Sequence, residues 1–399
     1  MDKIAKNGEN IVKNINIIKI IKYIINNIND NTIKINHLFL LTTVIYILFS
    51  DISVYSSVLA LFSAIFFYVS FIVGERLYYL LNLEEVIDNI IISKNKNYNG
   101  NNILKLISSY SLHYKLGIIL LFIGILFIFL DILWVRDIPL FNPLSRRFLN
   151  VQYTALSHML IVGWAIVISS KNLSKLKIGL YTLVFSALIM LIGYRTNVMV
   201  VLLSVIFVMY YSKKINTREV VISAVGIFGI LLLMSVIRLL MLSSSGNPIL
   251  SRIDLTMSVY DVIVKNFNGV FNGYLHYCAI YSYLGAAPGP RGVIAKIIGV
   301  SGVSITPTIF GAVIADYGTL GLVPYFGILG IFFGLFYKIS KKLGGIFLGL
   351  YSVISAYLLI GVETGILDLD VILYYLLGFI LCLGIICLRI KEFLKRVFK

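Results

Sequence analysis

The chain is dominated by apolar runs that recur along its whole length and are joined by short connections. Residues 54–74, for example, contain no charged side chain, and hydrophobic residues make up 59% of the sequence against 13% for charged ones. A water-soluble domain needs far more charge on its surface. Because backbone groups in hydrocarbon must be hydrogen-bonded within their own segment, and the runs do not alternate in polarity, we expect membrane-spanning helices.

The pattern predicts an all-α polytopic membrane protein with about ten spans, in a range of about ten to twelve. One long loop, residues 243–317, is expected to contain re-entrant helices in its second half. The expected spans are residues 36–50, 54–74, 116–135, 154–170, 178–194, 198–211, 220–241, 320–337, 346–362 and 371–388.

Lysines gather in every second connection, which is the pattern that places those connections in the cytoplasm. It predicts a cytoplasmic basic tail at residues 1–36, a single transmembrane domain at 37–388 and a second cytoplasmic basic tail at 389–399. Both termini of this cell-membrane protein are then cytoplasmic, and the outer loops are residues 136–153 and 243–317. The net charge of +16 follows from this topology, and no nucleic-acid-binding motif accompanies it.

The two kinds of basic residue separate between the two sides of the membrane. Of the 23 lysines only Lys265 and Lys296 fall outside, whereas seven of the 11 arginines do. These are Arg136, Arg146, Arg147, Arg195, Arg238, Arg252 and Arg291. An arginine presents a planar fork that binds phosphate in a bidentate manner. The bias therefore predicts a phosphate-bearing ligand on the outer side, and a single outer arginine could equally reach toward lipid headgroups.

A transfer reaction at such a site needs a general base, and three outer residues are candidates: His276, Asp316 and Glu363. Each has a structural alternative, and for Asp316 that alternative is a helix cap. Two further polar residues fall within spans. We expect Asp131 to pair with an outer arginine and His158 to be a hydrogen-bonded packing residue.

Several short segments are similar to the oligosaccharide repeat-unit polymerases of the O-antigen polymerase type, including archaeal-like relatives. They are Asn142-Pro-Leu-Ser-Arg-Arg147, Gly193-Tyr-Arg-Thr196, Gly289-Pro-Arg-Gly292, Thr306-Pro-Thr-Ile-Phe-Gly311 and Asp316-Tyr-Gly-Thr-Leu-Gly321. The resemblance covers roughly residues 115–390. It implies that Arg146, Arg147, Arg195, Arg252 and Arg291 are essential. Related ligases carry a histidine just before the final Gly-rich span, and this chain has none there, so the base is not implied.

The resemblance implies a membrane glycosyltransferase that polymerises oligosaccharide repeat units on the outer face of the membrane. Its substrate would be a glycan on undecaprenyl or dolichyl diphosphate, surrounded by membrane lipids, and a chain-length regulator and a flippase are the partners that this role implies. We expect Arg146, Arg147, Arg195, Arg238, Arg252 and Arg291 to bind the diphosphate. Arginines can stabilise that leaving group without a metal or a cofactor, so the enzyme is expected to be metal-independent.

Three alternatives remain open. A polyprenyl-phosphate-dependent glycosyltransferase would need an acidic pair for a divalent metal, and only Asp368-Leu-Asp370 has that spacing. A glycan ligase would transfer the same donor to another acceptor. A flippase or exporter of lipid-linked oligosaccharides would show charged spans and internal symmetry, which the sequence does not.

Overall fold

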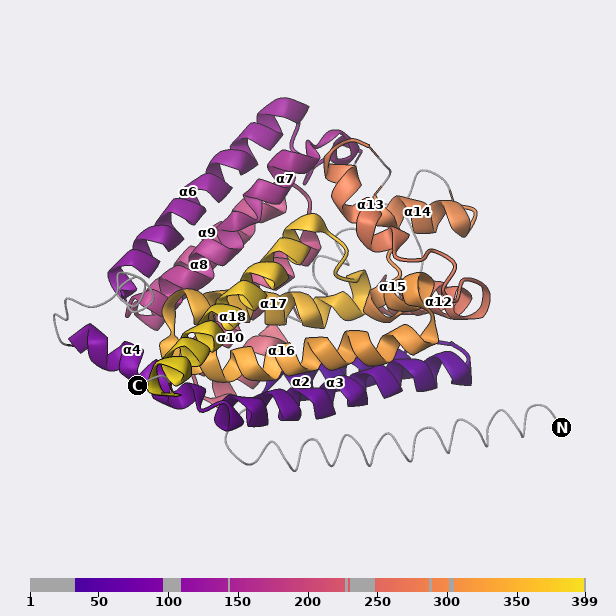
Figure 1. The fold of residues 1–399 in the computed structure, drawn as a ribbon. Coiled ribbons are helices and arrows are strands. Elements are labelled where there is room, and N and C mark those ends of the chain that lie inside the picture. Colours follow the sequence, from indigo (N-terminus) through magenta and orange to yellow (C-terminus); the bar gives the residue numbers. More distant parts are fainter. Residues whose placement is uncertain are drawn as a thin grey trace.

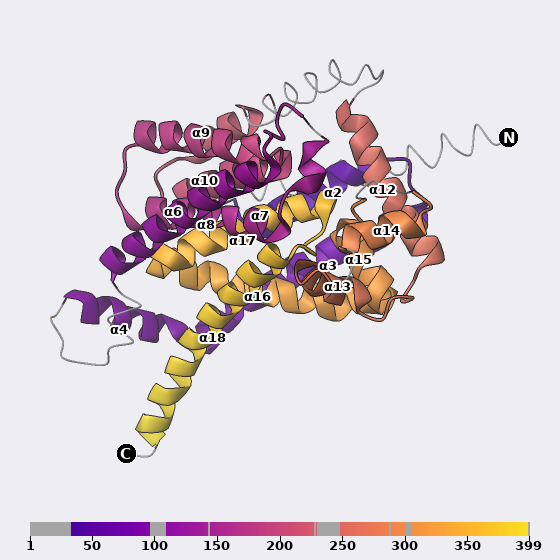
Figure 2. The same ribbon diagram turned by 90° about the horizontal axis from the view of Figure 1, so that it is seen from above.

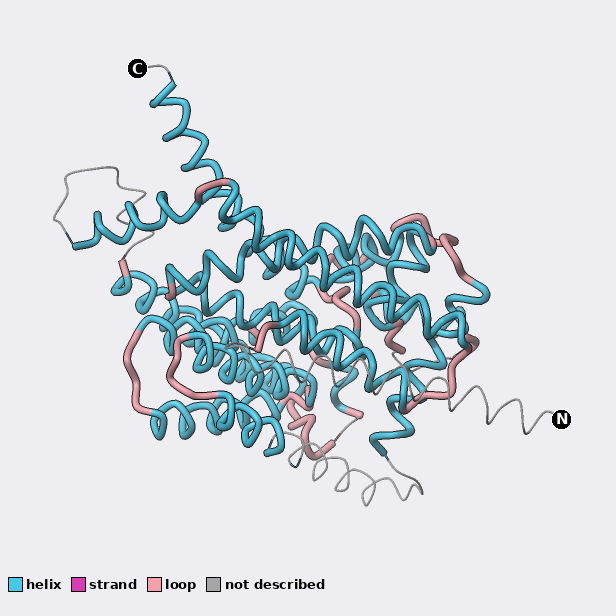
Figure 3. The backbone as a smooth tube through the Cα atoms, turned by 90° about the horizontal axis from the view of Figure 1, so that it is seen from below, coloured by secondary structure: helices cyan, strands magenta, loops and turns pink. Residues whose placement is uncertain are grey.

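The computed structural model describes residues 33–95, 109–142, 144–226, 229, 248–286, 289–300 and 305–397. Every regular element within these ranges is a helix (Figures 1 and 3), so the all-α prediction is confirmed. The helices are α2 (Ile35–Leu48), α3 (Val54–Leu80), α4 (Leu83–Asn95), α6 (Tyr110–Val135), η1 (Ser145–Phe148), α7 (Val151–Ser157), α8 (Met159–Ser170), α9 (Lys175–Leu191), α10 (Arg195–Tyr211), α12 (Pro248–Asn266), α13 (Tyr274–Tyr283), α14 (Pro290–Ile297), α15 (Thr308–Tyr317), η2 (Thr319–Gly321), α16 (Leu322–Leu343), α17 (Gly345–Thr364) and α18 (Leu369–Val397).

Six helical stretches of the described chain are long and apolar enough to cross a membrane. They are Val54–Leu80, Tyr110–Val135, Val151–Ser170, Thr319–Leu343, Gly345–Thr364 and Leu369–Lys391. Each matches one expected span. The expected spans 36–50, 178–194 and 198–211 correspond to the shorter helices α2, α9 and α10. With 14 residues, α2 extends about 21 Å, less than a typical hydrocarbon core. The expected span 220–241 lies mostly outside the described residues.

The two ends of the helix bundle differ in their basic residues. At one end, which we call the basic end, Lys342 lies 2.8 Å from both Glu84 and Asp88, which belong to α4. Lys214 donates to the Ile168 carbonyl there at 2.9 Å. The opposite end, which we call the loop end, carries α12, α13, α14 and α15 (Figures 1 and 2). Connections that the lysine pattern assigns to one side of the membrane therefore do contact one another.

Glycines allow the closest pairs of helices to approach. In α16, a methyl group on Gly330 would lie 2.6 Å from the Phe67 carbonyl oxygen of α3. In α8, a methyl group on Gly163 would lie 2.7 Å from the Gly117 carbonyl oxygen of α6. Small residues permit such backbone contact in membranes, where helices associate by van der Waals packing. The helices α3, α16, α6 and α8 form the framework that holds the loop end.

Replacing Gly330 with alanine should therefore destabilise the protein, by about 1–3 kcal/mol, because the new methyl group meets backbone that cannot rotate away. Thermal unfolding of the purified protein in detergent measures this. Gly179→Ala is the matched control, since a methyl group there meets nothing within 4 Å. Equal unfolding temperatures for the two variants would contradict close α3–α16 packing.

Candidate active site

The loop end brings a histidine and an aspartate together. His276 lies in the first turn of α13 and Asp316 in the last turn of α15, and the His276 Nδ1 atom is 2.5 Å from the Asp316 Oδ2 atom. The Asp316 side chain is fully buried. The His276 Nε2 atom is buried and has no hydrogen-bond partner among the described residues. With its proton on Nδ1, the imidazole keeps a lone pair on Nε2, as a general base requires.

Asp316 also caps the helix that carries this histidine. The residue before α13 is Gly273, which adopts a φ of 86° and has no side chain to offer. Instead, Asp316 accepts hydrogen bonds from the backbone N–H groups of Leu275 at 3.0 Å and His276 at 3.1 Å. The His276 N–H also donates to the Gly273 carbonyl at 3.1 Å, and a negative charge near the first N–H groups of a helix is favourable. The geometry favours His276 as the base and Asp316 as the residue that orients it.

A second histidine–aspartate pair lies at the other end of α13. The Tyr283 hydroxyl is 3.5 Å from Asp370 Oδ1, and His158 Nδ1 is 2.5 Å from Asp370 Oδ2. The Asn197 amide nitrogen is 2.5 Å from His158 Nε2. Burial and the Asp370 carboxylate raise the pKa of Tyr283, so its hydroxyl remains a donor. His158 is buried and both its ring nitrogens have partners, which confirms the expectation that it is hydrogen-bonded.

Two of the predicted arginines contact acids at the end of α17 and just before α18. Arg252 of α12 forms an ion pair with Glu363 in the last turn of α17. Arg291 of α14 forms one with Asp368, which directly precedes α18. The Tyr46 hydroxyl donates to the second Glu363 oxygen at 3.0 Å. Arginines from two separate helices therefore form ion pairs with acids in residues 363–368.

Arg146 contacts a different segment. Its guanidinium carbon lies 4.1 Å from the centre of the Tyr194 ring, a cation–π contact. The Asp368 side chain is 39% exposed; its partial burial raises the pKa of the carboxyl, and the positive charge of Arg291 counteracts that rise. Arg252 and Arg291, which are far apart in the sequence, therefore both pair with acids among residues 363–368.

The remaining predicted arginines stay predictions. Arg147 is exposed and Arg195, the first residue of α10, is half-buried. Neither forms an ion pair with a described residue. Arg195 directly follows Tyr194, the ring on which Arg146 lies. Arg238 lies outside the described residues.

A further aspartate attaches α12, and with it Arg252, to the bundle. Asp261 accepts from the hydroxyls of Ser53 at 2.5 Å and Ser56 at 2.7 Å, at the start of α3. Its partial burial acts to raise the pKa, but the hydrogen bonds from Lys265, Ser53 and Ser56 outweigh it and lower the pKa of Asp261 to about 2. The charged carboxylate holds α12 against α3 at neutral pH.

The expectation that Asp131 pairs with an outer arginine is wrong. Asp131 is completely buried in α6. Its two oxygens accept from the Asn150 backbone N–H at 2.8 Å and the Thr154 hydroxyl at 2.6 Å. These local donors satisfy the carboxylate and fix the start of α7 against α6, so no arginine is needed.

Within the described part of the chain, no group of three or more histidine, cysteine, aspartate or glutamate side chains is arranged to hold a metal ion. The carboxylates of the Asp368-Leu-Asp370 pair, which has the spacing of a metal motif, form ion pairs or hydrogen bonds with other side chains. Asp368 pairs with Arg291 and Asp370 with His158. The two carboxylates therefore point to different partners.

Comparison with known proteins places this chain in a family. The family model for O-antigen polymerases matches residues 32–375, which is most of the chain. The chain belongs to the O-antigen polymerase family. The chain is also 54% identical, over 361 residues, to an uncharacterised protein of Methanocaldococcus jannaschii. The alignment covers 90% of this chain and 97% of that protein. No solved structure matches the chain.

Membership in the O-antigen polymerase family, together with the spanning helices, makes this a multi-pass membrane protein of lipid-linked oligosaccharide polymerisation. Sequence reasoning did not find Asp370, Tyr283 and Asn197 as parts of the site. His158 and Asp370 are 212 positions apart, and no spacing rule connects them. The one available signal was Asp368-Leu-Asp370, an acidic pair at the outer end of a predicted span.

Proposed function

We propose that the protein is a glycosyltransferase that polymerises oligosaccharide repeat units carried on a polyprenyl diphosphate, and that it works at the loop end, on the outer face of the membrane. The observation that carries the proposal is the pairing of Arg252 and Arg291, from two separate helices, with acids among residues 363–368. In this orientation the basic end and both termini face the cytoplasm.

In the proposed reaction, a hydroxyl of one lipid-linked unit attacks the anomeric carbon of another. A new carbon–oxygen bond forms while the bond to the diphosphate breaks. The hydroxyl proton passes to His276 Nε2, and the polyprenyl diphosphate leaves with the electron pair. Arginine side chains stabilise the charge that develops on the leaving diphosphate.

The ion pairs at residues 363–370 fit this role. Without substrate, Glu363 and Asp368 offset the charges of Arg252 and Arg291 and hold the guanidinium groups in place. A guanidinium has five donors, so it can keep one carboxylate and still bind a phosphate oxygen. Arg147 and Arg195 would complete the diphosphate site, and the sequence assigns Arg238 to it as well.

The helix α13 sets the distance between the proposed base, His276, and the proposed diphosphate site. His276 and Tyr283 are seven residues apart, which corresponds to about 10 Å along a helix. Tyr283 contacts Asp370, close in sequence to Asp368, the partner of Arg291. A diphosphate bound at the arginines can therefore present its first sugar toward His276. Tyr317, whose ring lies 5.4 Å from that of His276, is half exposed and would move aside for the acceptor.

Deleting the gene and measuring the length distribution of the cell-surface polysaccharide tests the proposal. Loss of long chains with retention of single repeats is the expected result. Accumulation of lipid-linked units inside the cell would instead indicate a flippase, and an unchanged distribution would refute a polymerase.

Chelation of divalent metals distinguishes a metal-independent polymerase from a metal-dependent glycosyltransferase. Polymer formation in isolated membranes should continue in excess EDTA, because arginines take the place of a metal at the diphosphate. Loss of activity that returns on adding Mg²⁺ or Mn²⁺ would favour a metal-dependent polyprenyl-phosphate glycosyltransferase. Heat-treated membranes supply the background rate.

A further inference from the structure

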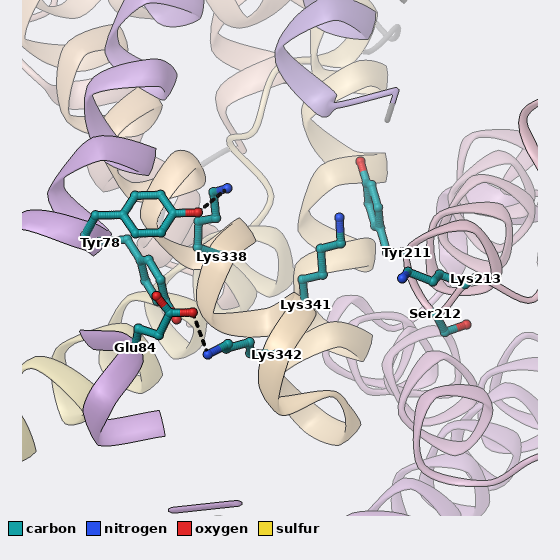
Figure 4. A pocket seen from close by; sticks show the side chains of 9 residues that line it. Tyr78, Glu84, Tyr211, Ser212, Lys213, Lys338, Lys341 and Lys342 are labelled. Atoms are coloured by element: carbon teal, nitrogen blue, oxygen red, sulfur yellow. Dashed lines mark hydrogen bonds and ion pairs between the residues drawn. The ribbon is translucent and has the colours of Figure 1, made fainter. Parts of the chain in front are cut away.

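A pocket of about 500 Å³ opens at the basic end, where the ends of α3, α4, α10 and α16 meet (Figure 4). Its lining includes four lysines, Lys213, Lys338, Lys341 and Lys342, but only one carboxylate, Glu84. The pocket is separate from the candidate active site. The 22 residues of α16 place the two at opposite ends of a helix about 33 Å long.

Two of the four lysines have carboxylate partners and two do not. Lys338 lies 3.4 Å from Glu75, and Lys342 pairs with Glu84 and Asp88. Lys213 and Lys341 form no ion pair with any residue in the described ranges. The Lys341 amine instead lies 3.3 Å from the Tyr337 hydroxyl. The pocket is therefore left with positive charge that the protein itself does not neutralise.

Two tyrosines that line the pocket have hydroxyl groups without a partner. Tyr78 is 2% exposed and Tyr211 is 4% exposed. Within the described structure, neither hydroxyl has a hydrogen-bond partner. A buried hydroxyl without a partner is unfavourable, and such groups in native proteins commonly meet a ligand or water. The Tyr211 hydroxyl, on the side of the pocket that carries Lys213 and Lys341, can donate to an anionic oxygen (Figure 4).

We propose that this pocket binds a phosphate group, with Lys213 and Lys341 supplying charge and Tyr211 supplying a hydroxyl donor (Figure 4). Lysine binds phosphate as a mobile point charge, in contrast to the arginines of the loop end. Because α3 and α16 are both candidate spans that end here, the phosphate lies at the depth of lipid headgroups. Basic pockets between helices on the cytoplasmic side bind such headgroups. An anionic lipid and free phosphate share this chemistry.

Thermal unfolding of the purified full-length protein tests the proposal. The protein is placed in phosphatidylcholine nanodiscs with and without phosphatidic acid, or in phosphatidylcholine nanodiscs with inorganic phosphate. Stabilisation by phosphatidic acid alone identifies a lipid headgroup, and stabilisation also by inorganic phosphate identifies a soluble anion. Either result supports the site if the Lys213→Gln/Lys341→Gln variant needs at least about tenfold more ligand for half of the maximal stabilisation.

The matched control is Lys115→Gln/Lys177→Gln, which removes the same charge from exposed lysines outside the pocket. It should respond as the unmodified protein does. Tyr211→Phe removes only a hydroxyl, so it should unfold normally without ligand and still bind more weakly. An unaltered response in the Lys213→Gln/Lys341→Gln variant, or an equal loss in the control, would overturn the proposal.

Discussion

Replacing Arg291 with alanine is expected to slow polymer formation by about 100-fold or more, the effect of removing one preorganised donor to a developing negative charge. Arg291 forms an ion pair with Asp368. In the proposed site, its loss removes a phosphate ligand and leaves the Asp368 charge to repel the diphosphate. Arg291→Lys should recover only part of the rate, since lysine keeps the charge but not the fork. Polymer length and initial rate in isolated membranes are the measurements.

The control is Arg218→Ala, which removes an exposed arginine that the sequence assigns to the opposite side of the membrane. It should polymerise normally. The Arg291→Ala/Asp368→Asn double variant separates binding from folding, because it removes the carboxylate that the single variant leaves unpaired. If the double variant regains activity, Arg291 is a structural partner of Asp368 and not a ligand of the diphosphate. If it is stable but inactive, the ligand role stands.

Replacing His276 with glutamine should lower the rate by about 100- to 10 000-fold, the usual contribution of a general base. Glutamine retains hydrogen-bonding ability but cannot accept a proton from the acceptor hydroxyl. Asp316→Asn should also slow the reaction, because a neutral amide neither holds the imidazole proton on Nδ1 nor caps α13 as well. Initial rates with the donor at saturating concentration report the chemical step.

His37→Gln serves as the control, because it changes another histidine, in α2, whose ring is 3.4 Å from the Tyr68 hydroxyl. It should leave the rate within a few-fold of normal. Long polymer made by the His276→Gln variant at the normal rate would remove His276 from the mechanism. Glu363, the remaining candidate base, would then be tested by Glu363→Gln, with its contact to Arg252 taken into account.

The sequence predicted the spanning helices well because their signal is local. A long uncharged run such as residues 54–74 has one stable structure in hydrocarbon, and α3 contains it. Charge counts also predicted which connections meet, as Lys342 and Glu84 do. The excess of arginines on the outer side predicted a phosphate-binding site, which stays a prediction; of these arginines, Arg252 and Arg291 form ion pairs with Glu363 and Asp368. In each case the residue type alone carried the information.

The pairings themselves could not be predicted, because they depend on tertiary packing. Nothing local in the sequence shows that Asp316 would satisfy the first turn of α13, 40 positions away, or that Asp370 would meet His158. Asp131 illustrates the opposite error. A buried charge in a span suggested an ion pair, but nearby backbone and hydroxyl donors were sufficient.

The helix α13 cannot stretch, and its two ends are anchored by acids from different helices, Asp316 and Asp370. It therefore keeps His276 and Tyr283 at a fixed separation. In the proposed reaction the attacked anomeric carbon is bonded to the diphosphate through a single oxygen, so the base and the arginines act on the same first sugar, whatever sugars follow. Variation among repeat units has to be accommodated beyond that first ring, in the exposed loops, so related chains could change their glycan without altering the reaction centre.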